Sequence, residues 1–239
     1  MIVPRAAVAA VLACLLTLAL AACGDDDKKA SRGGKTTEAA TTEAPQTTAA
    51  ESSATGCQKV KAPKAKGEGD LSAPKTELDP AKTYTAVFTT SCGLFSVALD
   101  VKESPKTASS FASLVEKGFY DGLTFHRIVP GFVIQGGDPK GDGSGGPGYS
   151  VTEAPPRDAA YTRGVVAMAK TEAEDPGTSG SQFYVVTGAD AQLPPDYAIV
   201  GKVSKGQDVV NRIGVLPTDP STEQPLEPVV IEKVAIQQS

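Results

Sequence analysis

From about Thr83 to the end of the chain, short apolar runs alternate with residues that favour turns. The runs are rich in Val, Ile, Phe and Tyr, which strands favour, and most are too short for a helix. Ser91–Gly93 separates the first two runs and predicts a hairpin. The eight runs are, in chain order, YTAVFTT, LFSVALD, FHRIV, FVIQ, GVVAMA, QFYVVT, AIVGKV and VVIEKVAI.

Two other stretches have the periodicity of helices. The first starts with Ser104 as a cap and Pro105 in the first turn, and Gly118 ends it. Its apolar residues Ala108, Phe111, Leu114 and Val115 share one face. The second, GQDVVNRIG, is shorter. Many short strands with only two helices, and no internal repeat, predict an all-β fold with a closed or nearly closed barrel.

The N-terminal part of the chain predicts export. Residues 1–22 have one early positive charge, Arg5, followed by a short apolar run that ends in small residues, as in a signal peptide. The ending LAAC resembles a bacterial lipobox, which would place a lipid on Cys23. An uncleaved membrane anchor is the alternative, because the run could just span a bilayer. Both interpretations put the rest of the chain outside the cytoplasm.

The residues after the signal divide into three parts. Residues 23–56 are rich in Thr, Ala, Glu and Lys, with hardly any large apolar side chain, which predicts a disordered tether. Residues 57–82 form a lead-in segment, and 83–237 the folded domain. Once Cys14 has left with the signal and Cys23 is lipidated, Cys57 and Cys92 are a disulfide candidate. Two unrelated thiols are the alternative.

Composition and motifs exclude several functions. The formal net charge of −5 argues against a nucleic-acid surface, and four cysteines with one histidine give little material for a zinc site. GDGSGG satisfies a dinucleotide-binding pattern, but Pro147 and Gly148 follow where that site needs a helix. No serine or cysteine lies in a recognisable nucleophile motif. We therefore expect chemistry without a cofactor, a metal or a covalent step.

The stretch FHRIVPGFVIQGGD places Arg127 among apolar residues, with no acidic residue before Asp138. Arg127 either extends its charge into solvent from a strand edge, or lies in an apolar pocket to polarise a bound group. His126, beside it, is the only histidine of the chain.

This stretch and four others, GSGGPGY, RGVVAMA, GTSGSQFYVV and AIVGKV, occur in an order that resembles the cyclophilin family of peptidyl-prolyl cis–trans isomerases. The resemblance covers about residues 84–236. It implies an eight-stranded antiparallel β barrel capped by two helices, which agrees with the strands and helices counted above. It also implies an isomerase that acts on Xaa–Pro bonds.

The resemblance also implies roles for individual residues. Arg127 matches the essential arginine, which stabilises the twisted amide, with Gln135 and Phe132 as its catalytic neighbours. Further positions are expected to bind substrate: Val133, Tyr184 and Leu193 in the proline pocket, Ala169, Lys170 and Gln182 along the main chain, and Tyr197 and His126 in support.

Some residues depart from the family pattern. Lys170 replaces a common Asn, Tyr197 a common His, and Gln192 the Trp of cyclosporin-sensitive members, so we expect weak cyclosporin binding. The expected partners are proline-containing segments of exported proteins and, through the lipid, a membrane, and we expect a monomer. A proline-binding chaperone or scaffold without turnover is the alternative function.

Overall fold

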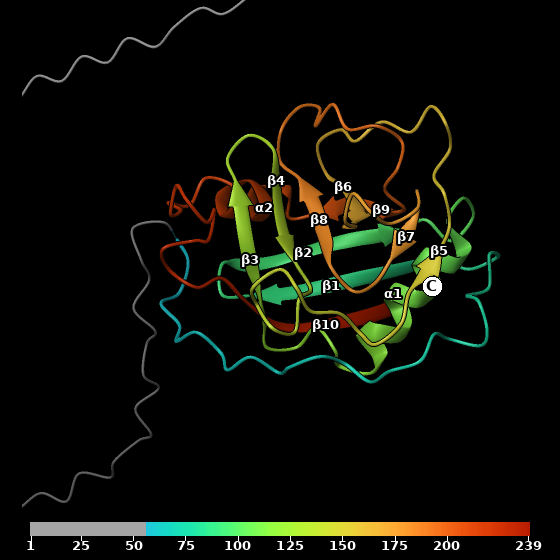
Figure 1. The fold of residues 1–239 in the computed structure, drawn as a ribbon, viewed down its shortest axis with the longest axis horizontal. Helices are drawn as coiled ribbons and strands as arrows, with labels where there is room; N and C mark the ends of the chain where they lie inside the picture. The colour runs from blue at the N-terminus through green and yellow to red at the C-terminus, as the bar shows by residue number, and fades with distance from the viewer. Residues whose placement is uncertain (1–55) are drawn as a thin grey trace, which may run out of the picture. The chain divides into compact units, whose positions relative to one another are not determined.

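The computed structural model describes residues 56–239 (Figure 1). The predicted signal peptide, the lipidation site Cys23 and all but the last residue of the predicted tether lie outside these residues. Between residues 56 and 239, neither helix has the length and hydropathy needed to cross a bilayer.

Eight antiparallel strands close into a barrel in the order β1-β10-β3-β4-β8-β6-β9-β2. Each contains most of one predicted apolar run, so the predicted fold class is confirmed. Two further strands, β5 (Val151–Thr152) and β7 (Thr178–Ser179), pair outside the barrel. The barrel strands are β1 (Tyr84–Thr90), β2 (Gly93–Leu99), β3 (Leu123–Val129), β4 (Val133–Gly136), β6 (Val165–Met168), β8 (Phe183–Val186), β9 (Ile199–Lys205) and β10 (Val230–Gln238).

Alternation along the strands fills the barrel interior with aromatic rings. Phe88 and Phe95 are cross-strand partners in β1 and β2, and their rings stack with centroids 4.5 Å apart. Phe125 and Phe183 reach the same core from β3 and β8, with ring centroids 6.0 Å apart. All four side chains are almost completely buried, so the barrel is packed and leaves no channel for a substrate.

The two predicted helices are present and lie at opposite ends of the barrel in Figure 1. Helix α1 spans Pro105–Glu116 and α2 spans Gln207–Ile213. The side chain of Ser104 does not cap α1. Instead, the carboxylate of Glu153 accepts hydrogen bonds from the backbone N–H groups of Lys106 and Thr107. The free N–H groups of the first turn are thus satisfied by a distant residue.

A second apolar cluster lies on the outer face of β4, β8 and β6. Because side chains alternate, these strands bury one set inside the barrel and another on this outer face. Phe132, Leu193 and Tyr197 pack against its edge. The second cluster makes this part of the barrel wall apolar on both faces, and it consists of Val133, Tyr161, Val165, Ala167, Tyr184 and Val186.

The lead-in segment, residues 57–82, runs along the barrel in extended form (Figure 1). Its first residue, Cys57, is joined to Cys92 by a disulfide, with a Cα–Cα distance of 4.0 Å. Further along, the N–H groups of Gly69 and Leu71 each donate to a carbonyl of the loop at Gly146–Pro147, at 2.9 Å. The segment therefore packs as part of the folded domain and supports the loop at 139–148.

Candidate active site

A β-bulge at His126 determines where Arg127 lies. Phe125 pairs with Gly136 and Arg127 pairs with Gln135, so one extra residue separates the two pairs on β3. Strict alternation would turn Arg127 to the same face as Phe125, which is buried in the core. The bulge instead turns Arg127 outward and lets Ile128 enter the core. Arg127 therefore stands opposite Gln135 on the outer face of the barrel.

The guanidinium of Arg127 is less buried than its apolar neighbours in sequence suggest. Its side chain is 34% exposed, so of the two alternatives raised by the sequence, a cation fully enclosed in an apolar pocket is not what the structure shows. Its Nε donates to the carboxylate of Glu223 at 2.5 Å, and its Nη1 donates to Gln135 Oε1 at 3.4 Å. The acidic partner lies in the loop before β10, far from the arginine in sequence.

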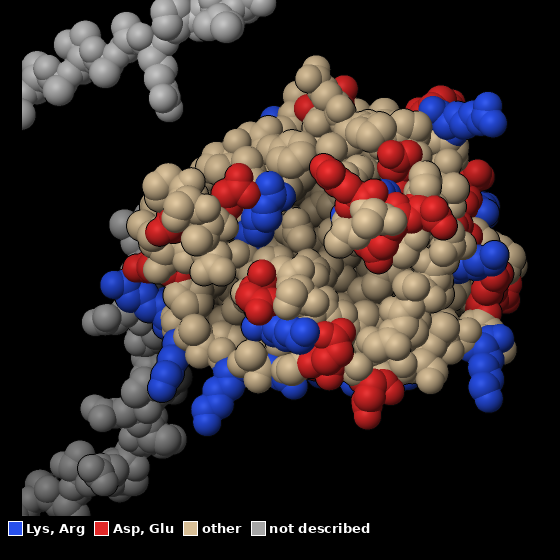
Figure 2. Space-filling model, viewed as in Figure 1, with Lys and Arg blue, Asp and Glu red and all other residues tan. Residues whose placement is uncertain are grey.

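A cavity of about 180 Å³ opens beside this guanidinium. Six of its nine lining residues are apolar or aromatic, and Arg127, Gln135 and Lys170 supply polar groups. Figure 2 shows a hollow on the face of the molecule turned toward the reader, with acidic side chains gathered along one side. The cavity brings together nine predicted site residues: Arg127, Phe132, Val133, Gln135, Ala169, Lys170, Tyr184, Leu193 and Tyr197.

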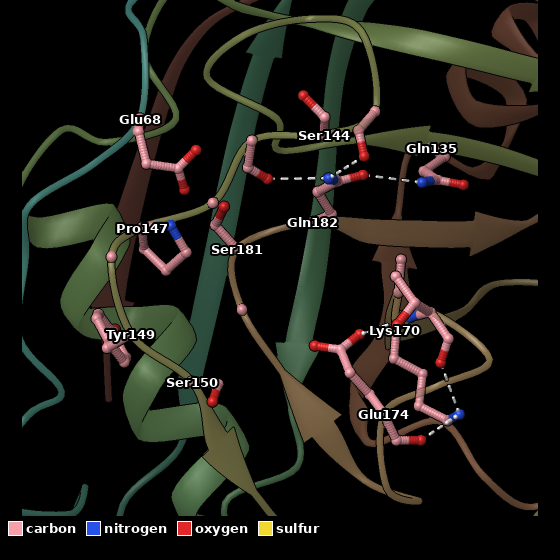
Figure 3. A pocket seen from close by; sticks show the side chains of 17 residues that line it. Glu68, Gln135, Ser144, Pro147, Tyr149, Ser150, Lys170, Glu174, Ser181 and Gln182 are labelled. Carbon is pink, nitrogen blue, oxygen red and sulfur yellow. Dashed lines mark hydrogen bonds between the residues drawn. The ribbon is translucent and has the colours of Figure 1, made fainter.

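Gln182, another predicted site residue, links the arginine to a glycine-rich loop. Gln135 Nε2 donates to Gln182 Oε1 at 3.0 Å, and Gln182 Nε2 donates to the carbonyls of Gly143 and Gly145 (Figure 3). The loop itself is held by Asp138, a buried carboxylate that accepts hydrogen bonds from three backbone N–H groups. No helix follows the loop, so GDGSGG is not a dinucleotide site.

A second, larger cavity of about 650 Å³ adjoins the first. The two cavities share Gln135, Ala169 and Lys170. Figure 3 shows Gln182 between Gln135 and the loop carbonyls to which it donates. Glu68 of the lead-in segment lines its far side and pairs with Lys140 at 2.7 Å. A peptide in the first cavity therefore has room to continue into the second.

Two predicted site residues have surroundings that the sequence did not indicate. The ammonium of Lys170 lies 5.6 Å from the ring centre of Tyr197 and donates to the carbonyls of Thr171 and Glu174. His126 lines neither of the two cavities. The bulge leaves it buried at 8% exposure, and neither ring nitrogen has a hydrogen-bond partner among the described residues. The structure therefore does not place His126 with the predicted site residues that line the two cavities.

The sequence did not indicate Glu223 as the ion-pair partner of Arg127. Glu223 lies in a polar loop without a recognisable motif, and the closure of the barrel between β10 and β3 brings it to Arg127. The apolar residues around Arg127 did indicate that a partner was needed, because a half-buried guanidinium requires an anionic group from elsewhere in the chain. They did not indicate which residue supplies it.

The sequence matches one protein family over residues 85–236: "Cyclophilin type peptidyl-prolyl cis-trans isomerase/CLD". Peptidyl-prolyl cis-trans isomerase B of Streptomyces anulatus is 38% identical over 175 residues, which cover 66% of this chain and 98% of that protein. Peptidyl-prolyl cis-trans isomerase A of Mycobacterium tuberculosis is 36% identical, covering 66% and 94% of the two chains.

Solved structures agree with this match. A cyclophilin type peptidyl-prolyl cis-trans isomerase of Cryptosporidium parvum aligns with a TM-score of 0.60 and 32% identity, over 65% of this chain and 98% of that one. The same protein in the presence of the dipeptide Ala-Pro aligns with a TM-score of 0.60 and 30% identity, over 64% and 98%. The residues that match the family model, 85–236, cover nearly all of the barrel described above, and the chain therefore belongs to the cyclophilin family of peptidyl-prolyl cis–trans isomerases.

Proposed function

We propose that this chain isomerises Xaa–Pro bonds of exported proteins without a covalent step, with Arg127 stabilising the twisted amide. The observation that carries the proposal is the cavity in which Arg127 and Gln135 border an apolar slot formed by Phe132, Leu193 and their neighbours. At about 180 Å³ the slot is smaller than the roughly 300–1,000 Å³ of sites for drug-sized ligands. It suits one apolar side chain, such as a proline ring.

The reaction needs a cation more than it needs a base. The amide resists rotation because of its partial double-bond character, and twisting it localises a lone pair on the prolyl nitrogen. An N–H donor of Arg127 can stabilise that lone pair from the edge of the slot. Raising the rate from about 0.01 s⁻¹ to about 100 s⁻¹ requires roughly 5.5 kcal/mol, which a positioned cation and an apolar slot can supply together.

The other site residues would hold the peptide. In this proposal Phe132, Val133, Tyr184 and Leu193 enclose the proline ring, and Tyr197 closes one side. Ala169 and Lys170 border both cavities, and Gln182 lines the larger one, so the main chain of the substrate would pass along these three residues.

The site of action is part of the proposal. The apolar N-terminal run ending in LAAC supports export and lipidation at Cys23, and the Cys57–Cys92 disulfide suits an oxidising compartment. In a bacterial host, a radiolabelled fatty acid should label the chain, and the chain should sediment with membranes. The Cys23→Ser variant should not be labelled. Equal labelling of both would contradict lipidation at this residue.

The enzyme can be separated from a binding module by exchange measurements. With a peptide that has one Xaa–Pro bond, catalytic amounts of the full-length chain should produce cis–trans exchange cross-peaks in NMR spectra. Phe132→Ala should weaken peptide binding, because Phe132 forms part of the apolar slot. Peptide binding by the wild-type chain without any faster exchange would instead support the chaperone or scaffold alternative.

A further inference from the structure

Arg127 is held on two sides, and each contact uses a different nitrogen. Glu223 accepts from Nε at 2.5 Å, and Gln135 accepts from Nη1 at 3.4 Å. Among the described residues, no hydrogen bond or ion pair occupies Nη2. The short contact to Glu223 therefore fixes one edge of the guanidinium, while N–H groups on the other edge remain for a ligand of the cavity that Arg127 lines.

The loop before β10 is built to present Glu223. The backbone carbonyl of Glu223 accepts a hydrogen bond from the N–H of Ile128 on β3 at 2.8 Å, so the loop is attached to the strand that carries Arg127. Its own N–H donates to the carbonyl of Asp219 at 2.8 Å. The Asp219 carboxylate accepts from the side chain and the N–H of Ser221, and these bonds lower the pKa of Asp219. Glu223 has a positive φ of 59°, which residues other than glycine seldom adopt.

The pair is poorly suited to stabilising the fold. Both side chains are partly exposed, at 34% for Arg127 and 43% for Glu223, and ion pairs at such positions contribute little to stability. The same contact has a large effect if it orients a reacting group, since a misplacement of about 1 Å can reduce a rate about 100-fold. We propose that Glu223 is a positioning residue, which holds the guanidinium of Arg127 toward the proline slot. This inference rests on the proposed role of Arg127.

The test compares four variants of the full-length chain in kcat, KM and unfolding by urea. Glu223→Ala should lower kcat about 10- to 100-fold and leave KM within about twofold, because the apolar slot is intact. Glu223→Gln should retain more activity, since its amide oxygen can still accept from Nε. Glu227→Gln is the matched control: Glu227 lies in the same loop and pairs with Lys59 at 3.8 Å, at the surface. It should behave like the wild type. Arg127→Ala completes the set.

The NMR signal of the Arg127 Nε–H group is the second readout, because its exchange with water reports whether the contact to Glu223 is present in solution. It should exchange slowly with water in the wild type and in Glu227→Gln, and rapidly in Glu223→Ala. An unchanged or higher kcat in Glu223→Ala would overturn the inference, as would a loss of kcat that follows a loss of stability. If Arg127→Ala also keeps full kcat, the proposed function fails. If only Arg127→Ala loses activity, the inference about Glu223 alone fails.

Discussion

The buried hydroxyl of Tyr184 predicts that its removal stabilises the fold, whereas most substitutions of buried residues destabilise it. Tyr184 is 4% exposed on the outer face of β8, and its hydroxyl has no hydrogen-bond partner among the described residues. Burial raises its pKa well above the ordinary value, so the group stays neutral. Leaving a buried polar group without a partner costs about 1–3 kcal/mol. Tyr184→Phe removes that group, keeps the ring, and should therefore raise the free energy of unfolding by roughly 1 kcal/mol.

Tyr161 provides a matched control in the same cluster, with ring centroids 6.4 Å apart. Its hydroxyl donates to the carbonyl of Tyr197 at 2.7 Å and accepts from the N–H of Tyr197 at 2.9 Å. Tyr161→Phe removes the same atom but leaves two backbone groups without a partner. It should lower the free energy of unfolding by about 1–3 kcal/mol.

Urea titration of the two variants measures both effects. The midpoints should move in opposite directions with unchanged slopes, and the melting temperature of Tyr184→Phe should rise by roughly 2–4 °C. The ring packing of Tyr184 against Tyr197, with centroids 5.7 Å apart, should be kept in Tyr184→Phe. A lower midpoint for Tyr184→Phe would refute the reasoning, because it would mean that the hydroxyl is hydrogen-bonded in solution.

Three further predictions concern His126, the Cys57–Cys92 disulfide and Gly137. Burial lowers the pKa of His126 from 6.5, so its contribution to stability is complete above about pH 6.5 and is lost as the pH falls through 6.5 toward the lower folded-state value. Urea titrations should show less loss of stability below pH 6.5 in His126→Leu, and an equal loss would contradict this. Replacing Cys57 and Cys92 by alanine should lower the free energy of unfolding by up to about 4 kcal/mol, because the bond closes a loop with a separation of 35 residues; identical urea midpoints would argue against it. Gly137→Ala should cost more than about 1 kcal/mol, since φ is +85° and a Cβ would lie 2.4 Å from the Ser181 carbonyl oxygen; wild-type thermal stability would exclude that clash.

The sequence predicted the elements of the barrel because each strand carries its own apolar run and each helix its own periodicity. Strands β5 and β7 were not predicted, because a strand of two residues is too short to show an alternating pattern. The cap of α1 was assigned to Ser104 by local rules. The structure satisfies the same N–H groups with Glu153, which is distant in sequence. Local signals thus predicted the elements, and missed contacts that only the closed barrel creates.

The same distinction applies to the site. Resemblance to the family indicated the residues of the slot, and the structure gathers Phe132, Val133 and Leu193 around one cavity with Arg127. The electrostatic surroundings of the arginine could not be predicted. The sequence shows no acidic residue between Arg127 and Asp138. The ion-pair partner of Arg127 is Glu223, which lies near it because β10 pairs with β3. Long-range pairing of this kind leaves no local pattern.

The most direct test of the account is the exchange rate of an Xaa–Pro peptide with wild-type chain and with Arg127→Ala, measured by NMR alongside peptide affinity. Arg157→Ala, a change at an exposed arginine, serves as the control. The account predicts that Arg127→Ala loses at least about 100-fold in kcat, or about 2.7 kcal/mol of transition-state stabilisation, while affinity changes little. Turnover by Arg127→Ala equal to that of the wild type and of Arg157→Ala would contradict the central role given to this guanidinium.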